Sequence, residues 1–132
     1  MKFASVRLVA ENIDEMVAFY ELVTGCTADW LAPVFAEIVT PGAVLALGSV
    51  ETVALFKEGS ALPRTNKTAI LEFMVADVDA EFERLKNRVE VVHIPKDLPW
   101  GNRTMQIADP EGTNVALYTP VTVEARRRFI NR

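Results

Sequence analysis

The chain has 132 residues, half of them hydrophobic, and a formal net charge of −4. This length suits one domain or two small modules that share a core. The negative charge argues against nucleic-acid binding, and the apolar runs are too short to span a membrane, so we expect neither partner. One cysteine, Cys26, excludes an internal disulfide and fits a reducing cytoplasm, where we expect the protein to reside.

The first half of the chain predicts one helix among several strands. Asn12 followed by Glu15 is typical of a helix N-cap, and Gly25 marks the expected end of that helix. Short apolar runs bounded by turn residues predict strands. We place these strands at residues 3–9, 27–31, 35–39, 43–48 and 52–57.

The second half repeats this order after residues 58–67, which have the polar composition of a linker. Asp77 and Thr122 are the expected caps of two further helices. Strands are expected at residues 68–75, 89–94, 103–108 and 114–119. A single domain of residues 1–132 would then consist of module one (1–60), module two (66–120) and a C-terminal helix (122–131).

Two weak internal repeats relate the halves. Residues 52–56 match residues 114–118 at an offset of 62, and residues 6–10 match residues 71–75 at an offset of 65. One supersecondary unit used twice explains both matches. Most strand connections are too short for parallel crossovers, so we predict an α+β fold. Two tandem βαβββ modules would form a curved mixed sheet with helices on one face and a cleft on the other.

Four motifs, in this order, resemble the vicinal oxygen chelate superfamily, which contains glyoxalase I, bleomycin-resistance proteins and extradiol dioxygenases. They are Asn12-Ile13-Asp14 leading to Phe19-Tyr20, residues 75–80, Pro99-Trp100-Gly101, and Asp109-Pro110-Glu111-Gly112. The resemblance covers nearly the whole chain. It is closest to the bleomycin-resistance-like and uncharacterised glyoxalase-like branch, and it implies tandem βαβββ modules and a homodimer.

The resemblance also implies a divalent metal held by His, Gln or Glu at four strand positions. These positions align to Ser5, Ala54, Ile70 and Ala116, none of which is a metal ligand. We therefore expect no metal and no other cofactor. The alternative is a hard cation held by oxygens elsewhere, for example those of Glu51 and Glu72.

Strand alternation predicts which side chains line the cleft. We expect the ligand-binding residues to be Arg7, Phe56, Glu72, Met74, Trp100, Asn114 and Tyr118. Aromatic walls suit flat ligands. Arg7 and Glu72 are equivalent positions of opposite charge. One interpretation is an ion pair between them at the seam of the sheet. In the other, Arg7 binds a carboxylate or phenolate of a ligand and Glu72 acts as a general base. The opposite face, including Leu8, Leu55 and Leu117, should pack under the helices.

Three further features have more ordinary interpretations. His93 is the only histidine, and we interpret it as a satisfied strand residue rather than a catalytic base. Trp30 fits either a loop lid or a packed strand end. The three arginines at 126–128 fit a solvated helix face or a subunit contact.

Together these observations favour a metal-independent protein that binds and sequesters a small aromatic or amphipathic molecule. An enzyme is the alternative: a lyase, isomerase or dioxygenase relative with an unusual metal or acid–base site. A third interpretation is an interaction module that acts through its C-terminal helix. The net charge favours a cationic ligand and Arg7 an acidic one, so the sequence leaves both open.

Overall fold

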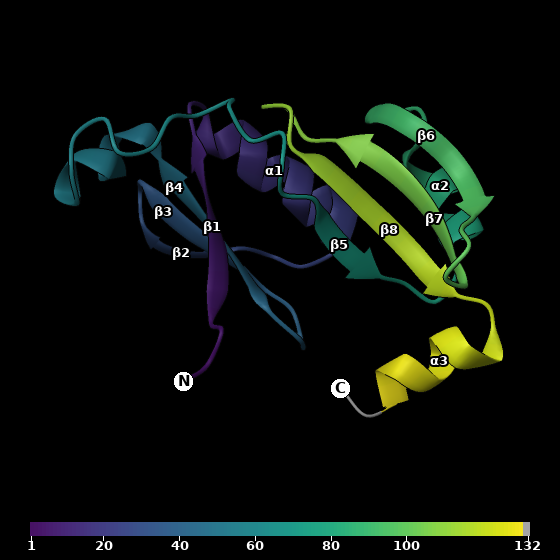
Figure 1. The fold of residues 1–132 in the computed structure, drawn as a ribbon. Coiled ribbons are helices and arrows are strands. Elements are labelled where there is room, and N and C mark those ends of the chain that lie inside the picture. The colour runs from purple at the N-terminus through teal and green to yellow at the C-terminus, as the bar shows by residue number, and fades with distance from the viewer. Residues whose placement is uncertain (131–132) are drawn as a thin grey trace. The chain divides into compact units, whose positions relative to one another are not determined.

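The computed structural model describes residues 1–130, and the chain divides into two compact units. Unit 1 comprises Met1–Asn66 together with Pro110–Gly112, and unit 2 comprises Lys67–Asp109 and Thr113–Arg132. Each unit has its own four-stranded mixed sheet (Figure 1). The predicted α+β fold with two tandem βαβββ modules is confirmed. Among the described residues, no helix is long and apolar enough to cross a bilayer.

Unit 1 has the strand order β1-β4-β3-β2. β1 pairs with β4 in parallel, and the other two pairings are antiparallel. Its strands are β1 (Ser5–Ala10), β2 (Asp29–Ala32), β3 (Phe35–Val39) and β4 (Val44–Ser49). Its helices are α1 (Ile13–Thr24) and a short 3-10 helix, η1 (Val50–Leu55).

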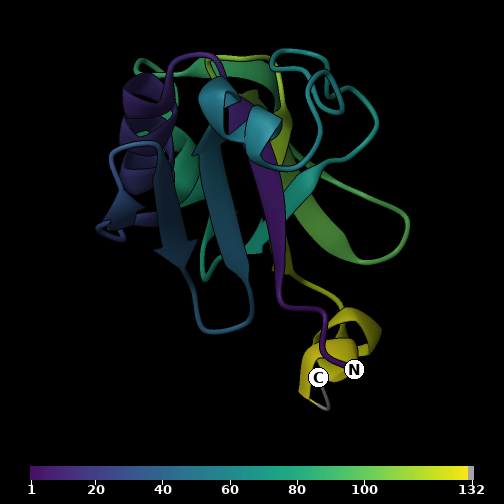
Figure 2. The same cartoon turned by 90° about the vertical axis from the view of Figure 1, so that its left-hand side faces the viewer.

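Helix α1 begins and ends at the residues that its sequence indicates. Asn12 Oδ1 accepts a hydrogen bond from Glu15 N at 3.1 Å, and Gly25 follows the helix with a φ of 70°. Met16 and Tyr20 of α1 are fully buried. The helix packs on β3 and β4, so one face of the unit-1 sheet is covered (Figure 2).

One predicted strand of unit 1 is wrong, because residues 50–55 form η1 instead. Ser49 Oγ accepts a hydrogen bond from Glu51 N at 3.4 Å, and Thr52 Oγ1 donates to Ser49 O at 2.7 Å. Such local bonds offer the backbone an alternative to a sheet ladder. Leu55, which we expected under the helices, is therefore 80% exposed.

Unit 2 has the strand order β5-β8-β7-β6, with β5 and β8 parallel and the other pairings antiparallel. Its strands are β5 (Leu71–Met74), β6 (Glu90–Asp97), β7 (Asn102–Ala108) and β8 (Asn114–Pro120). Its helices are α2 (Val78–Leu85) and α3 (Val123–Ile130). β5 is shorter and β6 longer than predicted. Residue 131, the expected end of the last helix, lies outside the described residues.

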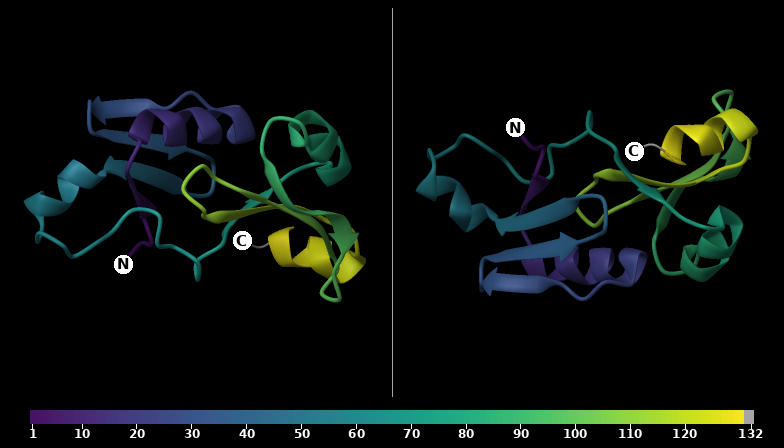
Figure 3. Two further views of the ribbon diagram at one scale, coloured as in Figure 1. Left: turned by 90° about the horizontal axis from the view of Figure 1, so that it is seen from above. Right: turned by 90° about the horizontal axis from the view of Figure 1, so that it is seen from below.

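The two helices of unit 2 lie on opposite faces of its sheet (Figure 3). α2 packs on β6, β7 and β8, where Leu85 of the helix and Leu117 of β8 are buried. On the other face, the ring of Phe129 in α3 lies 5.8 Å from the ring of Tyr118 in β8, measured between centroids. Helix α3 therefore covers part of the face that carries the candidate site.

Candidate functional site

The strand register defines equivalent positions in the two units. Arg7 on β1 is paired with Ala46 on β4, and Glu72 on β5 is paired with Ala116 on β8. Directly paired residues project from the same face of a sheet. Arg7 and Glu72 are therefore counterparts, as predicted. The counterpart of Ala116 is Ala46, and the alignment of Ala54 to that position is wrong because Ala54 lies in η1.

The residues present do not fit the metal that the resemblance implies. Ser5 opens β1 and Ile70 precedes β5, and of the aligned side chains only that of Ser5 has an oxygen. Glu51 and Glu72, the alternative pair, belong to different units. Within residues 1–130, no group of three or more His, Cys, Asp or Glu side chains could hold a metal ion. No chemistry is therefore assigned to a metal.

Unit 2 contains a cavity of about 550 Å³, a volume typical of small-molecule sites. Three of its lining residues are aromatic and two carry opposite charges. The lining residues are Glu72, Trp100, Asn102, Tyr118, Arg128 and Phe129. They come from β5, the segment before β7, β7, β8 and α3. The arrangement can hold a flat ring and provides polar groups to orient it.

The Pro-Trp-Gly segment attaches α3 beside this cavity. Gly101 has a φ of 93°, and its carbonyl oxygen accepts a hydrogen bond from Val121 N at 2.9 Å. Arg128 Nη2 donates to Trp100 O at 2.9 Å. A Cβ on Gly101 would lie 2.2 Å from Thr122 Oγ1, so only glycine allows the chain to approach α3 this closely.

Asn102, one of the lining residues, has a polar atom without a partner in the described part of the chain. This residue is 9% exposed, and its Oδ1 is buried without a hydrogen-bond partner among the described residues. Leaving a buried acceptor unpaired costs about 1–3 kcal/mol, so this oxygen calls for a partner such as an ordered water or a ligand N–H group. Asn102 was not predicted as a site residue, and its position directly after Trp100-Gly101 is the one sequence signal that indicates it.

Arg128 and Phe129 are also lining residues that the sequence analysis missed as ligand contacts. It interpreted the arginines as a solvated face or a subunit contact, whereas Arg128 is half-buried against the Trp100 carbonyl. Ala125, fully buried, precedes Phe129 by four residues. This spacing places both on one side of a helix and was the available signal.

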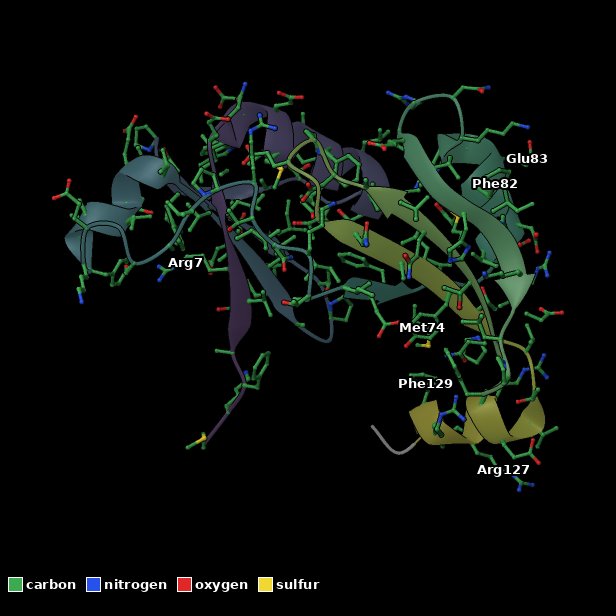
Figure 4. All side chains as sticks on the ribbon, turned by 45° about the horizontal axis from the view of Figure 1, so that its top comes forward. Arg7, Met74, Phe82, Glu83, Arg127 and Phe129 are labelled. Carbon is green, nitrogen blue, oxygen red and sulfur yellow. The ribbon has the colours of Figure 1, made fainter. Side chains whose placement is uncertain are left out.

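Unit 1 has a cavity of its own, of about 390 Å³. Its lining residues are Arg7, Val9, Thr52, Val53, Phe56, Ser60 and Ala61. Arg7 Cζ lies 4.4 Å from the centroid of the Phe56 ring, which is a cation–π contact. Figure 4 shows the Arg7 side chain on the side of β1 that faces η1.

The structure thus divides the seven predicted ligand-binding residues between two cavities. Arg7 and Phe56 line the cavity of unit 1, and Glu72, Trp100 and Tyr118 line that of unit 2. The other two, Met74 and Asn114, line neither cavity, although Met74 lies on the same side of unit 2 as Phe129 (Figure 4). A ligand role for the seven, and an Arg7–Glu72 pair, remain predictions.

His93 and Trp30 lie outside both cavities. The His93 Nδ1 atom lies 2.8 Å from Ile94 O, which agrees with its interpretation as a satisfied strand residue. Trp30 is partly exposed in β2, the strand next to β3 at the edge of the unit-1 sheet.

Arg103 joins three elements of unit 2. Its Nε donates to Asp79 Oδ2 at 2.9 Å, its Nη2 donates to Asp79 Oδ1 at 3.1 Å, and its Nη1 donates to Asp97 Oδ1 at 3.2 Å. The hydrogen bonds from Arg103 lower the pKa of Asp79, and those to Asp79 and Asp97 raise the pKa of Arg103. The N-terminus of α2, the end of β6 and the start of β7 are held together in this way.

Comparisons with known proteins agree with this architecture. A family model described as the Glyoxalase/Bleomycin resistance protein/Dioxygenase superfamily matches residues 2–117. A glyoxalase/bleomycin resistance protein/dioxygenase from Nocardioides is 23% identical with a TM-score of 0.78, over 93% of this chain and 85% of that one. A family enzyme from Burkholderia phytofirmans PsJN is 18% identical with a TM-score of 0.80, over 92% and 100%.

A virulence protein from Salmonella typhimurium is 19% identical with a TM-score of 0.73, over 92% of this chain and 98% of that one. At these identities the three solved structures show a shared fold and nothing more specific. No curated protein matches the chain.

Proposed function

Because the chain belongs to the Glyoxalase/Bleomycin resistance protein/Dioxygenase superfamily, we propose that it sequesters a small aromatic or amphipathic compound without a metal. The observation that carries this proposal is the cavity of unit 2. It combines three aromatic side chains with a buried Asn102 oxygen that has no partner in the described part of the chain. A ligand N–H group would satisfy that oxygen if binding turned the Asn102 side chain toward the cavity.

Binding would rest on burial of a flat ring against Trp100, Tyr118 and Phe129. Each 100 Å² of apolar surface removed from water contributes about 2.5 kcal/mol to the binding free energy. The entropy that the ligand loses on binding offsets a large part of this contribution. Glu72 and Asn102 both offer acceptor oxygens, whereas Arg128 already donates to the Trp100 carbonyl. A protonated amine of the ligand would pair with Glu72, the anionic residue of the lining, whereas Arg128 keeps its positive charge.

The proposal is tested by titrating naphthalen-2-ylmethylammonium into the Trp30→Phe variant, in which Trp100 is the only tryptophan. We expect a saturable change in Trp100 fluorescence, with a Kd that a chelator leaves unchanged. Zinc, nickel, manganese and iron(II) salts should not raise the melting temperature, because a ligand raises it only by binding the native state.

Asn102→Leu is the matched variant, since leucine fills a similar volume and removes the unpaired oxygen. We expect about tenfold weaker binding of the ammonium probe, with a urea midpoint that is unchanged or higher. Absence of saturable binding would overturn the proposal. Stoichiometric metal with a raised melting temperature would instead favour the enzyme alternative, for which Glu72 in the cavity is the candidate base. The homodimer expected from the resemblance also remains a proposal.

A further inference from the structure

The cavities of the two units carry opposite charges at equivalent positions. Arg7 lines the cavity of unit 1 and Glu72 lines that of unit 2, and each is paired in register with an alanine of the neighbouring parallel strand. We propose that the cavity of unit 1 is a second binding site, which takes an aromatic carboxylate. This site goes beyond the proposed function, which rests on the cavity of unit 2.

The Arg7 guanidinium is held ready for an anion. It lies over the Phe56 ring at 4.4 Å, and within unit 1 it has no carboxylate at ion-pair distance. A guanidinium presents five N–H donors in a planar fork that matches a carboxylate, and stacking leaves the edge of this fork unblocked. Although both side chains are exposed, the cation–π contact, modest in strength at such a site, favours this position of the cation before the ligand arrives.

Gly48 lies beside the stem of Arg7. A Cβ on Gly48 would lie 3.0 Å from Thr52 Oγ1, 3.6 Å from Arg7 Cδ and 3.6 Å from Phe35 Cδ2. The stem of Arg7 therefore reaches as far as this glycine of β4, and Thr52, whose hydroxyl is the nearest neighbour of the added Cβ, is buried.

The remaining walls decide the kind of anion. Val9, Val53 and the Phe56 ring supply apolar surface, and the lining includes no second cation. One guanidinium suits a single carboxylate better than a phosphate dianion, and the apolar walls suit an attached ring. Glu37, on the same sheet face across β4 from Arg7, does not line the cavity.

Three naphthalene probes of nearly equal size test this site by calorimetry and amide NMR: naphthalene-2-carboxylate, naphthalen-2-ylmethylammonium and 2-naphthalenemethanol. We expect the carboxylate to shift the amide signals of Ser60 and Ala61 in unit 1. Arg7→Gln should weaken carboxylate binding about tenfold and leave ammonium binding unchanged, since it removes a charge-assisted hydrogen bond. Arg7→Lys should retain more affinity for the carboxylate than Arg7→Gln but less than the parent protein, because lysine keeps the charge but lacks the planar fork.

Arg88→Gln is the matched control, because it removes an exposed arginine that lines neither cavity, and it should leave carboxylate binding unchanged. The proposal is overturned if Arg7→Gln binds the carboxylate as tightly as the parent protein, or if 2-naphthalenemethanol binds equally well at Ser60 and Ala61. Urea unfolding of each variant checks that the fold is intact. If the parent protein bound the carboxylate but not the ammonium probe, the proposed function of unit 2 would be contradicted and the site in unit 1 would still be supported.

Discussion

The cavity of unit 2 depends on the missing side chain at Gly101. Its φ of 93° is unfavourable for other residues, and a Cβ would meet Thr122 Oγ1 at 2.2 Å and Ala125 Cβ at 2.9 Å. We expect Gly101→Ala to lower the free energy of unfolding by about 2–4 kcal/mol, since strain and overpacking add. Displacement of α3 should also weaken binding of the ammonium probe.

Two other glycines separate these causes in urea unfolding experiments. Gly59 has a φ of 76° with nothing within 4 Å of an added Cβ, so Gly59→Ala should cost only about 1–2 kcal/mol. Gly42 has neither a positive φ nor a neighbour, so Gly42→Ala should be neutral. Equal midpoints for the Gly101 and Gly59 variants would contradict a role for the close contact with α3.

Residues with a strong local signature were predictable, and residues whose role arises from packing were not. Asn12 and Gly25 have side-chain and backbone preferences that fix a helix start and end on their own. Asn102 and Phe129 become site residues only because α3 folds back onto β8. That contact joins distant parts of the chain, and no local pattern encodes it.

The same distinction holds for secondary-structure elements. Strand alternation and the repeat predicted the βαβββ order, and the motifs predicted the family, which are both confirmed. The run 52–56 was misassigned because a short apolar segment with β-branched residues fits a strand and a helical turn equally well. The Ser49 hydroxyl, which accepts a hydrogen bond from Glu51 N, favours the 3-10 helix η1 at this position. The error carried into the alignment of Ala54.

The link between β7 and α2 should depend on pH. Arg103 binds both oxygens of Asp79 and holds the pKa of that carboxyl below its ordinary value of 3.8. A group with a lower pKa in the folded state contributes stability that is complete above the unfolded pKa and is lost as the pH falls through the folded pKa. The contribution is therefore constant near neutrality and disappears in acid.

Thermal unfolding of the parent and of Asp79→Asn between about pH 7 and pH 2 measures this contribution. We expect a small deficit in the melting temperature of the variant, since the pair is partly exposed. The deficit should stay constant above pH 3.8 and narrow below it. A deficit that grows in acid would contradict the assignment.

At the scale of the whole molecule, one short segment between two strands of unit 2 forms part of unit 1. Pro110–Gly112 lies between β7 and β8 in sequence but belongs to unit 1. The Glu111 carboxylate accepts hydrogen bonds from Glu11 N at 2.8 Å and Asn12 N at 2.9 Å, just before α1. Arg64 pairs with Glu11 and donates to Pro110 O at 3.3 Å. The Asp-Pro-Glu-Gly motif is thus part of the anchor for the first helix.

We therefore expect Glu111→Ala to destabilise unit 1 more than unit 2. Two backbone N–H groups lose their acceptor, which costs about 1–3 kcal/mol when the groups are buried. The two tryptophans report on separate units, Trp30 on unit 1 and Trp100 on unit 2. Urea unfolding in the Trp100→Phe and Trp30→Phe backgrounds follows each unit by fluorescence. The larger decrease in midpoint should be seen with Trp30.

Glu111→Gln is the matched control, because its amide oxygen can still accept one of the two hydrogen bonds. Its midpoint in unit 1 should fall between those of the parent and of Glu111→Ala. If Glu111→Ala lowered both midpoints equally, the turn would stabilise the chain without preference for α1. If it lowered neither, the hydrogen bonds to Glu11 and Asn12 would contribute nothing to the anchoring of the helix.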